Sequence, residues 1–489
     1  MRIMKNEIDN VKVVITNFIW RFMERAGAQL VQFIVSIFLA RILSPDDYGT
    51  VALIVVISNI FQVFVDSGLG NALIQKLDAD DIDFSSVFYV NIIFCLILYA
   101  ILFFSAPLVS MFYNKPELTA LTRVLCLTII IAGVRNIQQA YISRTLQFKK
   151  FFWATIIGTI ISAVVGIFMA YSGFGAWALV AQRLSNLGIS TAMLWIIVRW
   201  RPKFCFSFSR VKVLCQFGWK LMISSLINTI YSNLRQIIIG KFYSEKDLAY
   251  YNQGNQYPNV LAVTINVSID GVIFPVMSRQ QEDKERLRGM VRRSIKTATF
   301  ILAPIMIGIA AAGSNIIHIC LTDKWMPCLP YLRIFCISYI FYPIHTANLS
   351  AINAQGRSDI FLKLEIVKKV LGIMVIFISL HYGVLAIALG ELAVSFLGQV
   401  INAWPNRKLL EYSYFDQILD ILPNIILSLL MGSIVYFISD ITTLPLLNLF
   451  IQIIVGILVY IILSFITRNE TFIYFITYLQ KTIKRENAL

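Results

Sequence analysis

The stretch WRFMERAGAQLVQFIVSIFLARIL (residues 20–43) is long enough to cross a bilayer, which takes about 20 mainly apolar residues. Polar side chains nevertheless recur along it at i, i+3, i+4, i+8 and i+11, at Arg21, Glu24, Arg25, Gln29 and Gln32. A helix turns roughly 100° per residue, so these positions form one stripe. Each charge costs about 2.5 to 3.5 kcal/mol to insert, so such a stripe indicates a hydrated pathway. The alternative places residues 21–25 at the cytoplasmic headgroups, although Gln29 and Gln32 extend the same face well past that depth.

The composition places the whole chain in the class of polytopic membrane proteins. Of its 489 residues, 58% are hydrophobic and only 14% are charged, and the mean hydropathy is +0.74, which is far more apolar than a soluble domain. The net charge of +15 comes from Lys and Arg in short loops between apolar runs, so we expect no nucleic-acid partner. The seven cysteines include no C-x-x-C pair and the three histidines lie far apart, so we expect no metal site, disulfide framework or cofactor.

About fourteen apolar runs of spanning length follow one another, separated by short polar loops. If the N-terminus is cytoplasmic, alternate loops on that side hold most of the Lys and Arg residues. The opposite loops hold little beyond Arg41, Lys115, Lys241, Lys246 and Lys324. Because positive charge is retained in the cytoplasm, this asymmetry predicts a multi-pass protein with both termini on the cytoplasmic side.

An internal repeat appears at a separation of about 200 residues. ARILSPDDYG (residues 40–49) resembles GKFYSEKDLAYY (240–251), and YSGFGAWAL (171–179) resembles HYGVLAIAL (381–389). An even number of helices in each unit makes the repeat parallel. The sequence therefore predicts an all-α protein with two six-helix lobes around a central cavity, at residues 1–205 and 206–410. Residues 411–489 are expected to add two transmembrane helices and a cytoplasmic tail.

The repeat also reproduces the polar stripe. In the seventh run, Lys220, Ser224, Asn228, Tyr231 and Arg235 again share one helical face. The second and eighth runs add polar residues mostly in helical phase, at Asn59, Gln62, Asp66, Asn252, Gln256, Asn259, Asn266 and Asp270. We expect these helices and the first to line a water-filled cleft, although a single polar residue in such a helix is more often an interhelical hydrogen bond than a substrate contact.

Several motifs in order resemble a known family: LARILSPDDYGTVAL, DSGLGNALIQK (66–76), MFYNKPEL (111–118), RTLQFKK (144–150), GFGAWALVAQR (173–183) and IIGKFYSEKDLAYYNQ. The chain to about residue 404 is similar to the bacterial polysaccharide exporters of the multidrug/oligosaccharidyl-lipid/polysaccharide superfamily, most of all to the teichuronic acid exporter and the Wzx-type O-antigen flippases. The resemblance implies a bacterial cytoplasmic-membrane flippase. By alternating access, it would move an undecaprenyl-diphosphate-linked oligosaccharide from the inner to the outer leaflet. It also implies polymerase and chain-length proteins of the same pathway as partners.

A cleft with more cations than anions suits a diphosphate that must cross low dielectric, and arginine can hold phosphate oxygens with two hydrogen bonds. From their phase we infer the substrate-binding residues Arg21, Arg25, Lys220, Asn228, Tyr231 and Arg235. Candidates for coupling to H⁺ or Na⁺ are Glu24, Asp66 and Asp270, and nothing in the sequence chooses among them.

Two other function classes fit the sequence less well. A multidrug or small-molecule cation-coupled antiporter of the same superfamily is the alternative, but an aromatic and acid-dominated cavity would be typical of it. An enzyme is not expected, because no loop has room for a catalytic domain and no G-x-x-x-x-G-K-[ST] motif occurs. The acidic run at Asp78, Asp80, Asp81 and Asp83 contains the D-x-D pattern of glycosyltransferases, but without a soluble domain around it we expect a solvated loop.

Overall fold

The computed structural model describes residues 20, 23–24, 26–66, 69–76, 78–145, 147–439 and 441–477, without the side chains at 71, 217, 267, 268, 270, 272 and 275. The chain divides into two compact units, Met1–Ala249 and Tyr250–Leu489. The boundary predicted after residue 205 separates the two halves of the sequence repeat and not these compact units. It stays a prediction.

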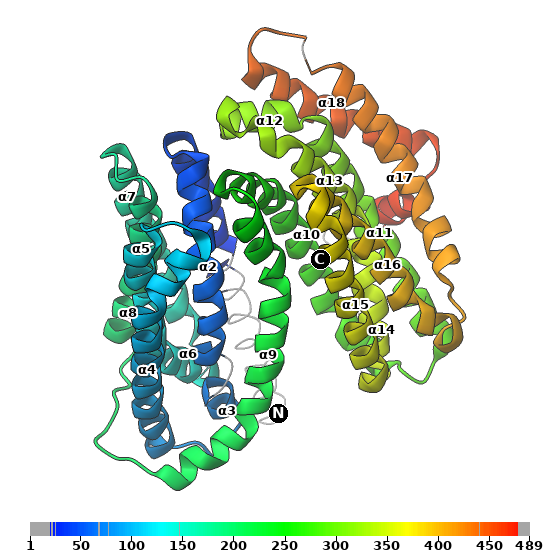
Figure 1. Cartoon of the computed structure of the whole chain (residues 1–489). Helices are drawn as coiled ribbons and strands as arrows, with labels where there is room; N and C mark the ends of the chain where they lie inside the picture. The colour runs from blue at the N-terminus through cyan, green and yellow to red at the C-terminus, as the bar shows by residue number, and fades with distance from the viewer. Residues whose placement is uncertain are drawn as a thin grey trace, which may run out of the picture. The chain divides into compact units, whose positions relative to one another are not determined.

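The first unit is built from helices throughout its described part (Figure 1). After an apolar helix at Ala26–Ile42, the elements are α2 (Pro45–Asp66), α3 (Leu69–Gln75), α4 (Asp81–Tyr113), α5 (Leu118–Leu125), α6 (Leu127–Thr145), α7 (Phe148–Tyr171), α8 (Ala176–Ile197), α9 (Phe208–Phe242) and the first turn of α10 (Glu245–Arg279). One core cluster joins α3, α4, α6, α7, α8 and the start of α9 through residues such as Phe88, Ile137 and Leu194. Burial of these apolar side chains stabilises the unit at one end of its long helices.

The second unit is also helical over the residues that are described. Beyond α10 its elements are α11 (Lys284–Ala311), α12 (Gly313–Cys320), η1 (Asp323–Cys328), α13 (Leu329–Ile340), α14 (Tyr342–Ala354), α15 (Ser358–Ser379), η2 (Leu380–Tyr382), α16 (Val384–Leu409), α17 (Tyr414–Phe437) and α18 (Pro445–Ile466). Helices α17 and α18 both contact α11. Asp420 of α17 accepts two hydrogen bonds of 2.7 Å from Arg292 of α11, and Tyr460 of α18 donates to the Phe300 carbonyl of α11 at 2.9 Å. Ile421 of α17 is also a member of the apolar core cluster of this unit, so α17 shares that core.

The two halves of the predicted repeat have the same local structure where their sequences match. The Ser44 hydroxyl donates to the Asp47 carboxylate at 2.6 Å, and the Asp47 amide donates back to Ser44 at 3.2 Å. Ser244 and Asp247 make the same pair of bonds at 2.6 and 3.1 Å. Each Ser-Asp pair satisfies backbone donors that a helix leaves unpaired at its start, so α2 and α10 begin at corresponding positions.

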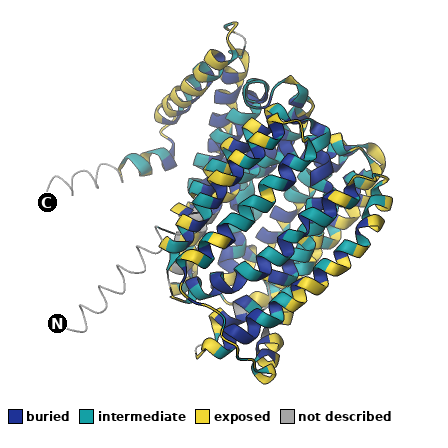
Figure 2. Ribbon diagram, turned by 90° about the vertical axis from the view of Figure 1, so that its left-hand side faces the viewer, coloured by how far each residue is buried: buried dark blue, intermediate teal, exposed yellow. Residues whose placement is uncertain are grey.

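Nine of the described helical segments are long and apolar enough to cross a membrane, and a tenth is added if α9, bent by 46° near residue 217, counts as one span. Other predicted runs coincide with the helix at Ala26–Ile42 and with α8, α10 and α15. The all-α membrane architecture is confirmed, whereas the count of fourteen stays a prediction. Along single helices, exposed residues follow one side and buried residues the other (Figure 2), and many of the exposed ones are large and apolar, which suits contact with lipid.

Candidate functional site

The predicted polar stripe lies on one face of α9, which runs beside α2, α3 and α4 (Figure 1). Lys220 and Asn228 are exposed, Tyr231 is half-buried, and Arg235 is buried with 8% of its surface accessible. The Arg235 guanidinium carbon lies 6.0 Å from the centroid of the Tyr231 ring, within the range of a cation–π contact. The stripe therefore passes from an open cationic end at Lys220 to a sheltered one at Arg235.

Not all the predicted site residues can be placed. Arg21 and Arg25 lie outside the described residues, and so does the side chain of Asp270 in α10. Glu24 is described and buried. Of the four cations predicted for the cavity, the structure thus describes Lys220 and Arg235, and it brings both onto the same helix.

Asp66 lies at the C-terminal end of α2 and lines a cavity of about 200 Å³ inside the first unit. The Gln62 side chain donates a hydrogen bond of 3.2 Å to its carboxylate. The rest of the lining combines polar and apolar side chains from α3, α6 and α7: Gly70, Ile74, Asn136, Gln139, Ala140, Ile142, Ser143, Phe148 and Phe151. A carboxylate among amide and hydroxyl groups is a set of donors and acceptors that can hold water, a proton or a hard cation.

The end of α2 and the start of α3 meet α6 beside this cavity. The Asn136 amide donates to the Val65 carbonyl at 2.6 Å, which satisfies an acceptor that the end of a helix leaves unpaired. A Cβ on Gly70 would lie 2.2 Å from the Asn136 side-chain oxygen, so a larger residue would force the Asn136 side chain to move. Gly70 is thus a point of close contact between α3 and α6.

The sequence interpretation missed the α6 contribution to this cavity. Asn136, Gln139 and Ser143 follow the fourth apolar run with polar groups about one helical turn apart, which places them on one face. This spacing is the feature of the sequence that predicts a polar face on this helix. Their position opposite Asp66 depends on how α6 packs on α2 and α3, which no local pattern determines.

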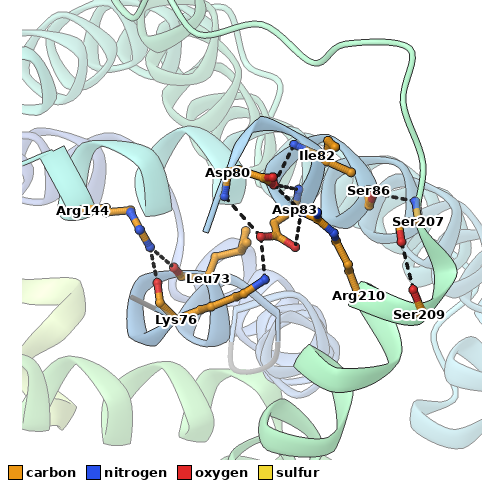
Figure 3. Close-up of polar contacts among 10 residues, drawn as sticks. All are labelled: Leu73, Lys76, Asp80, Ile82, Asp83, Ser86, Arg144, Ser207, Ser209 and Arg210. Atoms are coloured by element: carbon orange, nitrogen blue, oxygen red, sulfur yellow. Dashed lines mark hydrogen bonds and ion pairs between the residues drawn. The ribbon is translucent and has the colours of Figure 1, made fainter. Parts of the chain in front are cut away.

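The acidic run before α4 is more ordered than the solvated loop that the sequence predicted (Figure 3). Asp80 caps α4 by accepting from the amides of Ile82 and Asp83 at 3.1 and 3.0 Å. Asp83 is fully buried and pairs with Lys76 at 2.7 Å, and Arg210 lies 2.6 Å from Asp80. The hydrogen bond from Arg210, aided by the Asp83 amide, lowers the pKa of Asp80 to about 2. This cluster ties the start of α9 to α3 and α4, so the D-x-D residues serve the scaffold.

Polar residues of α10 in the second unit mostly bond to neighbouring helices. The Tyr339 hydroxyl of α13 lies 3.0 Å from the side-chain oxygens of both Asn255 and Asn259. The Thr346 hydroxyl of α14 donates to Asn266 at 3.3 Å. The expectation that single polar residues in these helices join helices together is confirmed at these positions. Within the described residues, no group of three or more His, Cys, Asp or Glu side chains could hold a metal ion.

A family model described as "Polysaccharide biosynthesis protein" matches residues 38–330. The chain is 26% identical over 329 residues to the succinoglycan biosynthesis transport protein ExoT of Rhizobium meliloti (strain 1021), with 67% of each chain covered. It is also 26% identical over 304 residues to the teichuronic acid biosynthesis protein TuaB of Bacillus subtilis (strain 168), covering 61% of this chain and 62% of that one. The solved structure of the lipid II flippase MurJ in an inward closed conformation matches with a TM-score of 0.74 at 18% identity, over 92% of this chain and 99% of that one. At 18% identity, the match to MurJ shows that the two chains share a fold.

Proposed function

Because the chain belongs to the family of polysaccharide biosynthesis proteins, we propose that it is a flippase for an undecaprenyl-diphosphate-linked oligosaccharide. It carries this lipid from the inner to the outer leaflet of a bacterial cytoplasmic membrane by alternating access. The product feeds the synthesis of a surface polysaccharide such as O-antigen, capsule or a teichuronic-acid-like polymer. Polymerase and chain-length proteins act on the same lipid afterwards and are the partners that we propose.

The cationic face of α9 is the observation that carries this proposal. A buried arginine in an apolar helix is costly, so it marks either a structural ion pair or a ligand pathway. Here Arg235 shares its face with an exposed lysine and with Asn228 and Tyr231, whose amide and hydroxyl groups match sugar hydroxyls. Arg235 and Lys220, together with the predicted Arg21 and Arg25, pair with the diphosphate.

Purified protein in liposomes tests the proposal directly. Lipid-linked oligosaccharide is loaded on both leaflets, and the fraction open to an added glycosidase is followed with time. We expect this fraction to rise beyond the outer-leaflet share only when the protein is present. Transport of cationic drugs driven by an ion gradient, with no movement of the lipid-linked sugar, would favour the antiporter instead.

Asp66 is the residue that we propose for coupling to H⁺ or Na⁺, because it lines the cavity beside Gln62. Glu24 and Asp270 are the further candidates. With an imposed ion gradient, Asp66→Asn should lose the gradient-dependent part of transport and keep the basal part. Asp78→Asn, which changes an exposed acid in the α3–α4 loop, is the matched control and should respond like the wild type. Equal gradient responses in both variants would remove Asp66 from the coupling step.

Both termini lie in the cytoplasm in this proposal, as the Lys and Arg asymmetry predicts. Reporter fusions after Lys212, Arg288 and Lys484 should give cytoplasmic signals, and those after Lys115 and Lys246 external ones. An external signal at Arg288 would contradict the two-lobe topology.

A further inference from the structure

The connection between α8 and α9, residues 198–207, is held against the start of α4 at several points. We call it the strap. The Lys203 amide donates to the Ser85 hydroxyl at 3.0 Å, and the Ser207 amide donates to the Ser86 hydroxyl at 2.9 Å (Figure 3 shows the latter). The Lys203 side chain also pairs with Asp81 at 2.6 Å. These bonds satisfy backbone N–H groups of the strap that are not paired within a helix or a sheet. The strap therefore has a defined position on the first unit.

Three phenylalanines are exposed where the strap runs into α9. Phe204, Phe206 and Phe208 are 103%, 56% and 71% exposed, while Cys205 and Ser207 between them are half-buried. This alternation is that of an extended chain, in which successive side chains face opposite ways. Three exposed aromatic rings within five residues form an apolar patch, which in a soluble setting would be unfavourable.

The strap lies where α4 changes from polar to apolar. Its 33 residues span about 50 Å at 1.5 Å per residue, more than the roughly 30 Å hydrocarbon core of a bilayer. The first turns, Asp81 to Ser86, bond the strap, and the long apolar stretch begins at Val87. Tyr89, whose side chain is only partly buried, lies at the same level, because its hydroxyl donates to the Lys203 carbonyl, and tyrosine is enriched at membrane–water interfaces. If the hydrocarbon core begins near Val87, the phenylalanines lie at the depth of the headgroups and the first acyl carbons.

The charge around the patch is positive. Between residues 198 and 216 there is no acidic side chain, whereas five cations occur there: Arg199, Arg201, Lys203, Arg210 and Lys212. Lys203 and Arg210 are held in ion pairs with aspartates. Arg199 and Lys212 are exposed, and neither makes an ion pair with another described residue. An apolar patch flanked by such cations is complementary to an anionic membrane surface.

We propose that the strap and the first turns of α9 form an interfacial lipid-binding element, which inserts Phe204, Phe206 and Phe208 into the adjoining leaflet and holds anionic phospholipid headgroups through Arg199 and Lys212. The proposal needs the chain to span a membrane but does not depend on the substrate that it carries. The strap thereby fixes the start of α9, the helix that bears the cationic stripe, relative to the membrane surface.

Lipid contact at the strap can be measured with a fluorescent label in liposomes. The label is placed by Phe206→Cys, with Cys205, Cys215 and Cys320 changed to serine because they are not buried. The control label is placed by Asp78→Cys in the exposed α3–α4 loop. We expect lipids with a nitroxide near the headgroup to quench the label at 206 at least threefold more than the label at 78, and aqueous iodide to do the reverse. Equal iodide quenching at both positions, or a label at 206 that neither quencher reaches, would overturn the proposal.

The charge preference has its own measurement. Quenching of the label at 206 by nitroxide-labelled phosphatidylglycerol should exceed that by nitroxide-labelled phosphatidylcholine at least twofold. Arg199→Gln with Lys212→Gln should abolish this excess, whereas the control pair Lys363→Gln with Arg468→Gln should retain it. Both control residues are exposed cations of the second unit. Equal quenching by the two lipids in the unmodified strap would show that its cations hold no anionic headgroup.

Discussion

Replacing Arg235 tests whether this arginine binds the transported ligand or stabilises the fold. Its guanidinium is sheltered, with 8% of the residue exposed, and lies 6.0 Å from the Tyr231 ring. Hydrogen bonds to charged groups contribute about 1.5 to 3 kcal/mol each, so loss of a two-bond contact to a diphosphate should cost about 3 kcal/mol or more. Since about 1.4 kcal/mol corresponds to a tenfold change in rate, Arg235→Gln should slow transport by roughly 100-fold.

Arg235→Lys should give an intermediate rate, roughly tenfold below wild type. Lysine keeps the positive charge but lacks the planar fork that binds two phosphate oxygens, so about half of the interaction is lost. The assay is the liposome measurement described above, with each variant's thermal unfolding in detergent recorded on the same preparation. Arg286→Gln is the matched control, because it removes an exposed arginine at the start of α11 and should leave transport unchanged.

The opposite result would assign Arg235 to the scaffold. Removing one partner of a buried ion pair typically costs about 3 to 5 kcal/mol of folding free energy, because the other charge is left uncompensated. A structural Arg235 therefore predicts a large fall in the unfolding temperature for both Gln and Lys variants, with transport reduced only in proportion to folded protein. Wild-type transport in Arg235→Ala would refute the cationic pathway outright.

Two further predictions concern the scaffold of the first unit. Gly49→Ala should lower the free energy of unfolding by about 1 to 3 kcal/mol, since the new Cβ would lie 2.0 Å from the Glu245 carbonyl oxygen. The control is Gly188→Ala, whose Cβ meets nothing within 4 Å and which should leave the unfolding temperature unchanged or higher. Arg210 is the largest cause, together with the Asp83 and Ile82 amides, that lowers the pKa of Asp80 from 3.8 to about 2, so the stabilisation from ionised Asp80 is present above about pH 4 and is lost as the pH falls through about 2. The difference in unfolding temperature between wild type and Arg210→Gln should thus be constant from pH 7 to 5 and shrink below pH 4, and a constant difference down to pH 2 would contradict this assignment.

The properties that consecutive residues carry by themselves were predictable from the sequence. Apolar runs of spanning length identify the all-α membrane class, because a backbone in lipid must satisfy its own hydrogen bonds. The spacing of Lys220, Asn228, Tyr231 and Arg235 places them on one face of α9 wherever that helix lies. The Ser-Asp pairs at the starts of α2 and α10 form by contacts within one helical turn, so they too follow from the sequence.

Only the tertiary structure decided which of these side chains are sheltered and which distant residues meet. Helical phase does not reveal that Lys220 is exposed while Arg235 on the same stripe is buried, because burial depends on the neighbouring helices. Asn136 reaches the Val65 carbonyl across 71 positions, and Arg210 reaches Asp80 across 130. Such pairs form where side-chain shapes let helices pack, and this information is distributed over many residues of both helices. The cavity at Asp66 and the fixed strap depend on pairs of this kind.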